Sequence, residues 1–491
     1  VAVLGTGSDV GKSIITTALC RILDQQGIRV APFKAQNMSN NSGVTPEGLE
    51  MGRAQIVQAE AAGIPPHVDM NPILLKPTSE VGAQVVVGGK VWANHSARDY
   101  HARKAELWIS ACQALQRLRQ QYEVVVLEGA GSCAEVNLMD HDIVNLRMAA
   151  EAEAPAIVVG DIHRGGIFAQ LVGTLACLPE AQQSQVAGFI VNRFRGDLSL
   201  FQEGVDWIEA RTRRPVYGVL PWYTDFAIES EDSVVIEAPR GVRPGRITGP
   251  AIAVLRLPHI ANFTDMDVLG EVPGLAVHYL EQVQALAGFR AVILPGSKNT
   301  RHDLNWLHST GWTARLQAFV RGGGHILGIC GGYQMLGQRV EDPQGLEGRP
   351  GGTPGLNLLP LTTVLKAPKT ITRTDFCWDR REVSCSGYEI HMGQTDRAGG
   401  RAWFQRTRQN DTPVASAEGC VSENGRVRGS YLHGLLDSAD VLRAWLAAIG
   451  LDRLEVPAEI GWRGKQRAYD QLADHFRAHM RMGAIGALVG L

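Results

Sequence analysis

The feature that most constrains this 491-residue chain is a glycine-rich loop close to its start. The apolar run at 1–5 predicts a strand, the loop at 5–13 reads GTGSDVGKS, and the apolar spacing of 14–27 predicts an amphipathic helix. Glycines let backbone N–H groups converge on phosphate oxygens, a lysine adds a point charge, and a serine hydroxyl can bind Mg²⁺. The strict pattern has a glycine where Thr6 stands, so this loop is a variant with one extra residue after its first glycine. The sequence therefore predicts a nucleotide site that includes Lys12 and Ser13.

Apolar strands alternate with longer amphipathic stretches through residues 1–236, which predicts a parallel sheet covered by helices on both faces. Residues 237–250 are rich in Pro, Gly and Arg and are expected to form a linker. The pattern restarts at 251, continues into a turn-rich strand region to about 432, and ends in helical sequence. We therefore predict two doubly wound α/β domains, 1–236 and 251–491, with the C-terminal helices in the second.

Composition limits the kind of partner. Lys and Arg total 48 against 50 for Asp and Glu, a net charge of −2, so no global field favours nucleic acid or an anionic membrane. No apolar run reaches the roughly 20 residues that span a bilayer, and the first residues lack the features of a signal peptide. The eight cysteines are scattered without a C-x-x-C pair, which favours free thiols and argues against zinc. We expect a cytoplasmic protein that acts on small molecules and lacks its initiator Met here; its oligomeric state stays open.

Polar side chains follow later strands of the first predicted sheet, at the edge where open α/β sheets bind ligands. Glu128 ends one apolar strand, Asp161 ends the next, and Asn192 ends a third. Either carboxylate is able to hold Mg²⁺ directly or through water, and Asn192 lies where a nucleotide base would be framed.

A second chemical site is indicated in the second half of the chain. Cys330 lies in GGGHILGICGGYQMLG, at a sharp strand-to-helix turn that exposes a thiol and favours its ionised form. The N–H groups of Gly331 and of the loop with Gly296 and Ser297 are candidates for an oxyanion hole. His433 ends another strand and is the candidate general base. A phosphate loop and a nucleophilic cysteine together suggest a glutamine-dependent amide ligase, in which one domain activates an acceptor with ATP and the other releases ammonia.

The motifs also carry a family resemblance. The GTGSDVGKS loop resembles dethiobiotin synthetase-like nucleotide domains, and GICGGYQMLG with SYLHG resembles class I glutamine amidotransferases. Segments along the whole chain resemble the cobyric acid synthase family: PFKAQNMSNNS at 32–42, GRAQ at 52–55, DMNPILLKPT at 69–78, ARDYH at 97–101, EGAGS at 128–132, DIHRGG at 161–166, FRGD at 194–197, NFTD at 262–265 and GYEIH at 387–391.

The resemblance implies ATP- and glutamine-dependent amidation of the b, d, e and g carboxylates of adenosylcobyrinic acid a,c-diamide, through acyl phosphates, in cobalamin biosynthesis. It implies that Asn192 binds adenine, that Ser13 and Glu128 hold Mg²⁺ with Glu50 as a further candidate, and that Asp142 lies near the reacting carboxylate. Asp142 also fits a structural role at a helix N-terminus. The residues implied in ATP binding at the loop are Thr6, Gly7, Ser8, Asp9, Val10, Gly11, Lys12 and Ser13.

One position departs from the general amidotransferase pattern. Most class I amidotransferases follow the catalytic histidine with Pro-Glu, whereas His433 is followed by Gly-Leu. The cobyric acid branch shares this feature, which implies a Cys330–His433 dyad or an orienting group from elsewhere, such as Glu389. Since a third group chiefly fixes the histidine tautomer, glutamine hydrolysis by a dyad would survive but be slow.

Two other functions stay open at this point. Cobyrinic acid a,c-diamide synthase shares both domains but acts at other carboxylates; the KAQNM and NPILLKPT segments favour the four-amide enzyme. A ParA/MinD-like switch ATPase would not need Cys330 or His433.

Overall fold

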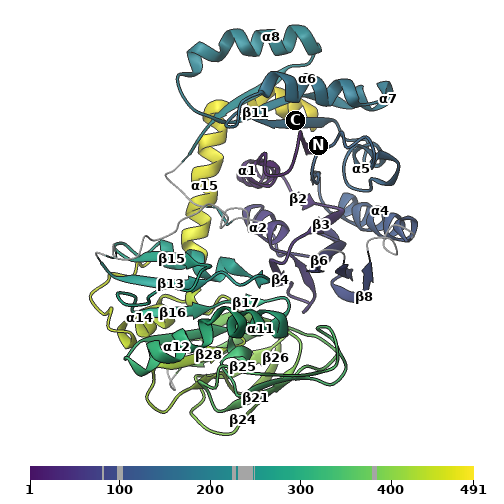
Figure 1. The fold of residues 1–491 in the computed structure, drawn as a ribbon. Helices are drawn as coiled ribbons and strands as arrows, with labels where there is room; N and C mark the ends of the chain where they lie inside the picture. The colour runs from purple at the N-terminus through teal and green to yellow at the C-terminus, as the bar shows by residue number, and fades with distance from the viewer. Residues whose placement is uncertain (80–81, 97–102, 224–227, 230–246, 248, 379–383) are drawn as a thin grey trace.

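The computed structural model describes the chain except for residues 80–81, 97–102, 224–227, 230–246, 248 and 379–383. Two α/β domains contact each other near the middle of the molecule (Figure 1). The prediction of two doubly wound domains is confirmed by two separate, mostly parallel six-stranded sheets. Most of the expected linker, residues 237–246 and 248, lies outside the described residues.

The first sheet is wholly parallel, with the order β12-β11-β10-β1-β9-β2. Because β1 lies between β10 and β9, the loop that follows it emerges where the strand order reverses, the usual ligand position in such sheets. The strands are β1 (Ala2–Gly5), β2 (Val30–Phe33), β9 (Val124–Glu128), β10 (Ala156–Asp161), β11 (Val186–Phe194) and β12 (Val216–Pro221).

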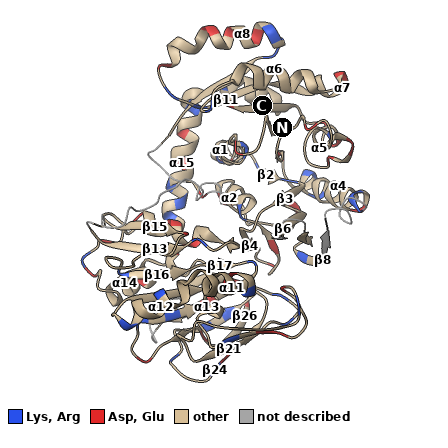
Figure 2. Ribbon diagram, in the orientation of Figure 1, with Lys and Arg blue, Asp and Glu red and all other residues tan. Residues whose placement is uncertain are grey.

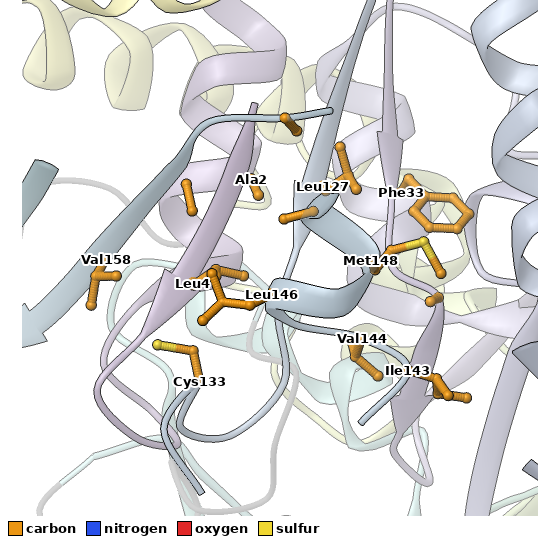
Figure 3. Packing of buried hydrophobic residues seen from close by; sticks show 14 of the residues in the cluster. Ala2, Leu4, Phe33, Leu127, Cys133, Ile143, Val144, Leu146, Met148 and Val158 are labelled. Carbon is orange, nitrogen blue, oxygen red and sulfur yellow. The ribbon is translucent and has the colours of Figure 1, made fainter. Parts of the chain in front are cut away.

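Helices cover both faces of this sheet, which is why its strands are apolar throughout. One face packs on α4 (Lys104–Gln121), α5 (Leu146–Glu151), α6 (Ile167–Cys177) and α8 (Gln202–Thr212). Figure 3 shows part of this core, in which Leu4 of β1 and Leu127 of β9 meet Leu146 and Met148 of α5. The opposite face packs on α1 (Lys12–Gln25) and on two C-terminal helices, α15 (Trp462–His479) and α16 (Met482–Leu488).

The C-terminal helices therefore differ from their predicted place in the second domain. Leu472 and Phe476 of α15 are buried in the same cluster as Val3 and Ile15 of the first domain. Helix α15 runs along the first domain from the region of the second (Figure 1, yellow). Amphipathic spacing identified α15 as a helix, but it gives no information on which of two cores covers its apolar face.

A smaller part of the first domain reaches toward the second. Strands β3 (Gln36–Met38), β6 (Ile73–Ser79), β7 (Gly82–Val87) and β8 (Lys90–Ser96) form a four-stranded sheet. The hairpin β4 (Ser42–Val44) and β5 (Glu50–Gly52) leads into α2 (Arg53–Ala61). Strand β4 contacts two strands of the second domain, β22 (Thr370–Trp378) and β23 (Ser384–His391).

The second domain is built on the sheet β15-β13-β16-β18-β28-β27, in which β27 alone is antiparallel to its neighbour. Helices α11 (Thr300–Thr310), α12 (Trp312–Arg321) and α13 (Gly331–Met335) cover one face, and α10 (Asp267–Gly270) and α14 (Ala439–Ala448) the other. The strands are β13 (Ala251–Leu255), β15 (Ala276–Leu280), β16 (Ala291–Leu294), β18 (His325–Ile329), β27 (Cys420–Val421) and β28 (Val427–Ser430).

The turn-rich region predicted to extend to about 432 folds into two further four-stranded sheets beside this one. One contains β20-β19-β21-β24 and the other β23-β22-β25-β26. Their strands are β19 (Arg339–Asp342), β20 (Gly351–Pro354), β21 (Leu361–Val364), β24 (Gln394–Arg397), β22 (Thr370–Trp378), β23 (Ser384–His391), β25 (Phe404–Gln409) and β26 (Thr412–Glu418), and a short ribbon pairs β14 (Ile260–Ala261) with β17 (Gly296–Ser297).

We predict that Phe476→Ala lowers the free energy of unfolding by about 3–5 kcal/mol, because it empties a fully buried site between α15 and the first sheet. Arg467→Ala is the matched control on the same helix. Its ion pair with Glu459 is exposed, so about 0–1 kcal/mol is expected. Denaturant unfolding measures both; equal effects of the two variants would contradict the docking of α15 as a core element.

Candidate active site

The phosphate loop lies between β1 and α1, as its sequence predicts. Gly11 has a φ of 102°, and a Cβ there would lie 2.1 Å from the Asn192 side chain, so only glycine fits. The Lys12 Nζ donates hydrogen bonds to the carbonyl oxygens of Gly7 at 2.7 Å and Gly131 at 3.0 Å. The lysine is thus held over the loop, where it would meet the terminal phosphate of a nucleotide.

This loop opens into a cavity of about 850 Å³. The cavity also reaches the start of the four-stranded sheet at Gln36 and Met38, and Trp222 and Tyr223 after β12. The site residues expected from the sequence that line it are Ser8, Asp9, Gly11, Lys12, Ser13, Glu128, Asp142 and Asn192.

Three loop residues expected to bind the nucleotide do not line this cavity. The Thr6 N–H donates to the Val159 carbonyl at 2.9 Å, so it continues the sheet. The Val10 side chain is buried in the core, and its carbonyl accepts a hydrogen bond from Asn192 at 2.9 Å. Gly7 contributes its carbonyl to Lys12. These contacts shape the loop, and nucleotide binding by Thr6, Gly7 and Val10 stays a prediction.

Ser13 and Glu128 fit a magnesium ion. Their side-chain oxygens are 2.8 Å apart, near the edge of about 3 Å that an octahedron with Mg²⁺–oxygen bonds of about 2.1 Å requires. The Lys34 Nζ donates to the same Glu128 oxygen at 2.8 Å, and Gln58 donates to the other. A hydroxyl and a carboxylate are hard oxygen donors of the kind Mg²⁺ prefers.

Glu50, the further metal candidate, is placed elsewhere. Its oxygens accept hydrogen bonds from Lys76 and Lys369, both at 2.7 Å, and Ser42 donates to it as well. Burial would raise the pKa of Glu50, but the two lysines lower it well below its ordinary range. Glu50 is the ion-pair partner of Lys76 and Lys369 and does not line the cavity that contains Ser13 and Glu128, so its assignment as a ligand beside Ser13 is corrected.

Arg193 links the loop to the end of β10. It donates to Asp9 and to Asp161, each at 2.9 Å. Asp161 is therefore an ion-pair partner of Arg193 and does not line the cavity.

Asp142 lines the same cavity as the phosphate loop. Its carboxylate accepts the N–H groups of Val144 at 2.9 Å and Asn145 at 3.1 Å. Burial raises its pKa, while those N–H groups and Lys104 lower it in part. Asp142 therefore orders the turn before α5 and lines the cavity that contains Lys12; its role near the reacting carboxylate stays a prediction.

The thiol site lies at the end of β18. Cys330 has a φ of 53°, an unusual value for a non-glycine residue, and its N–H donates to the Ser430 carbonyl at 2.8 Å. A Cβ on Gly331 would lie 2.9 Å from the Ser297 backbone nitrogen, so glycine allows these two segments to meet. Cys330, Gly331, Gly296 and Ser297 line a second cavity, also of about 850 Å³.

His433 lines the same cavity and is held by a carboxylate. Its Nδ1 is 2.7 Å from the Asp265 Oδ2, and the Gly434 N–H donates to the other Asp265 oxygen at 2.9 Å. Burial would lower the pKa of His433, but Asp265 and the Cys330 sulfur both favour its charged form, and the pKa rises to about 10. Cysteine, histidine and aspartate thus form the arrangement of a nucleophile, a base and an orienting group.

Residues of both domains line this second cavity. Lys76, Gln84, Lys90 and Val91 belong to the first domain. Lys298 donates to Gln84 at 3.0 Å, and burial, with nearby Lys369 and Lys76, lowers its pKa to about 7. Glu347 lies in the same cavity, and burial raises its pKa to about 7. The cavity therefore contains an amine and a carboxyl group whose pKa values are both about 7. Charged residues are scattered over both domains (Figure 2).

Comparison with known proteins agrees with this two-site architecture. Residues 1–234 match the CobQ/CobB/MinD/ParA nucleotide binding domain, and residues 251–441 match the CobB/CobQ-like glutamine amidotransferase domain. The chain is 49% identical to a cobyric acid synthase of Chlorobium phaeobacteroides over 100% of its length and 99% of the relative's. It is 42% identical to that of Vibrio campbellii, over 98% of this chain and 99% of the relative. The chain belongs to the cobyric acid synthase family.

For this member of the cobyric acid synthase family, the expected dyad is corrected to a site with a third group, Asp265. Glu389, the orienting residue suggested from sequence, instead accepts two hydrogen bonds from Arg406, both at 2.8 Å, and is near His391. The only sequence signal for Asp265 was its place in the NFTD segment, which resembles the family. Its contact with His433 spans 168 residues of sequence, so no local pattern indicated it.

No helix among the described residues is both long and apolar enough to cross a membrane.

We predict that Asp265→Asn reduces glutamine hydrolysis by about 10²–10⁴-fold, because the amide no longer selects the Nδ1–H tautomer or stabilises the charged ring. Steady-state ammonia release from glutamine measures the loss. Amidation with ammonium salts serves as the control for folding and is expected to persist. A variant that retains full glutamine hydrolysis would show that Asp265 does not orient His433.

Proposed function

We propose that this protein uses ATP and glutamine to convert the b, d, e and g carboxylates of adenosylcobyrinic acid a,c-diamide into amides, in cobalamin biosynthesis. Family membership over the full length supports the substrate. The observation that carries the chemistry is the pairing of a phosphate loop with a thiol–imidazole–carboxylate site in one chain. A carboxylate is a poor electrophile, so it must be activated before ammonia can attack it.

In the first domain, the terminal phosphoryl group of ATP passes to a corrinoid carboxylate and gives an acyl phosphate. Lys12 and the loop amides neutralise charge on the phosphates during this transfer. Ser13 and Glu128 would hold Mg²⁺, which supplies further positive charge at the phosphates. Asp142, which lines the same cavity, would position the acceptor end. Ammonia then attacks the acyl carbon, and phosphate leaves.

In the second domain, the Cys330 sulfur attacks the side-chain amide carbon of glutamine. His433 takes the thiol proton and returns it to the departing ammonia, leaving a γ-glutamyl thioester that water hydrolyses to glutamate. The N–H groups of Ser297 and Gly331 lie beside the nucleophile, where they would stabilise the oxyanion. Lys298 and Glu347 suit the α-carboxylate and α-ammonium of free glutamine by charge.

We predict that Cys330→Ala abolishes glutamine-dependent amidation yet forms the same tetra-amide from ammonium salts, because acyl phosphate formation lies in the other domain. Higher pH should increase the rate with ammonium, since free ammonia is the nucleophile. Lys12→Ala is the matched counterpart and should abolish amidation with either nitrogen source. Mass spectrometry of the corrinoid product measures each reaction.

Two results would contradict this division of labour. Full glutamine-dependent amidation by Cys330→Ala would show that the thiol is structural. Ammonium-dependent amidation by Lys12→Ala would show that the loop does not transfer phosphoryl groups.

A further inference from the structure

The side-chain amide of Asn262 connects the general base to the other domain. Its Nδ2 lies 3.3 Å from the His433 Nε2, and its Oδ1 accepts the Ser42 N–H at 3.0 Å. Ser42 belongs to β4 of the first domain. Because the oxygen is committed to the Ser42 N–H, the NH₂ group must face the imidazole. The first domain thus sets which way this amide points.

That contact engages the nitrogen that the reaction needs. Asp265 holds the Nδ1 of His433, so the lone pair that accepts the Cys330 proton is on Nε2. An amide donor at Nε2 favours the neutral ring, whereas Asp265 and the Cys330 sulfur favour the charged ring. Asn262 and Cys330 therefore compete for Nε2. The Cys330 thiol also has a second acceptor, the Ile390 carbonyl at 3.4 Å, so it is not committed to the imidazole alone.

We infer that Asn262 is a positioning residue that occupies the proton-accepting nitrogen of His433 until ligands bind the first domain. The inference rests on the proposed function. It gives the glutaminase a resting arrangement in which the base is engaged, so that ammonia is not released without an acceptor. Release requires only that the amide turn or shift away from Nε2.

A short path joins the two cavities through this contact. Gln36 and Met38 line the nucleotide cavity, and three residues separate Met38 from Ser42. The neighbouring Asn41 fixes the same segment, since its Oδ1 accepts the Phe263 N–H at 3.3 Å. Ligands that move β3 therefore act on both hydrogen bonds that hold the segment with Asn262, the one from the Ser42 N–H and the one to the Asn41 Oδ1.

Two local features are typical of a segment that can adopt a second conformation. Asn262 has a φ of 51°, in the left-handed region that costs energy for a residue with a side chain. The carboxamide oxygen of Asn40 is buried and has no hydrogen-bond partner among the described residues.

The test compares Asn262→Gly with Asn357→Gly. Glycine keeps the left-handed backbone, and Asn357, with a φ of 53° on an exposed turn of the same domain, controls for the backbone change. Glutamine hydrolysis is measured alone and with ATP, Mg²⁺ and adenosylcobyrinic acid a,c-diamide. We expect about 10-fold stimulation of the parent protein and the Asn357 variant. Asn262→Gly should hydrolyse glutamine alone at about the stimulated rate, through kcat with KM unchanged, and respond less than about twofold to the ligands.

Asn41→Ala provides a second variant that leaves Asn262 intact and weakens its anchor; it should raise the unstimulated rate in the same direction. Amidation with ammonium salts shows that each variant has folded. Equal losses of both rates in Asn262→Gly would overturn the inference, as would a parent protein that hydrolyses glutamine equally fast with and without acceptor. If the parent protein hydrolyses no glutamine under any condition, the proposed function itself fails.

Discussion

The carboxylate of Glu50 is buried between lysines that come from opposite sides of the domain interface. Lys76 lies on β6 of the first domain and Lys369 precedes β22 of the second, and both donate to it at 2.7 Å. A buried charge is tolerated only when it is paired, and removal of one partner typically costs about 3–5 kcal/mol. A shift of the domains that left Glu50 buried without Lys369 would incur this cost. The ion pairs therefore fix the position of one domain relative to the other.

In this relative position, both domains contribute residues to the cavity of the thiol site. The second domain supplies Cys330, His433 and Asp265, but Lys76 and Gln84 of the first domain close the cavity in front of them. The same approach brings β4 against the segment that contains Asn262. A glutaminase assembled in this way has a direct physical connection to the domain that consumes its ammonia, without a separate signalling element.

The sequence predicted the parts of the molecule that depend on local patterns. Glycines at 5–13 identified the phosphate loop, and glycines around Cys330 identified the nucleophile turn, because each shape needs residues without a Cβ at particular positions. Contacts between distant segments were not predictable in this way. Asp265 contacts His433 across 168 residues of sequence, and α15 packs its apolar face on the first domain. Glu50 and Glu389 were misassigned because a carboxylate that binds a lysine or arginine has the same sequence signature as one that binds a metal or a histidine.

We propose that ammonia made at the thiol site becomes the amide nitrogen formed at the phosphate loop. Incubation of the protein with ATP, Mg²⁺, adenosylcobyrinic acid a,c-diamide and glutamine labelled with ¹⁵N at its amide tests this directly, with unlabelled ammonium as competitor. Mass spectrometry should find four new amides that carry ¹⁵N in excess of its share in the free ammonia pool. A product with no new amides, or with amides drawn from the unlabelled pool alone, would contradict the account.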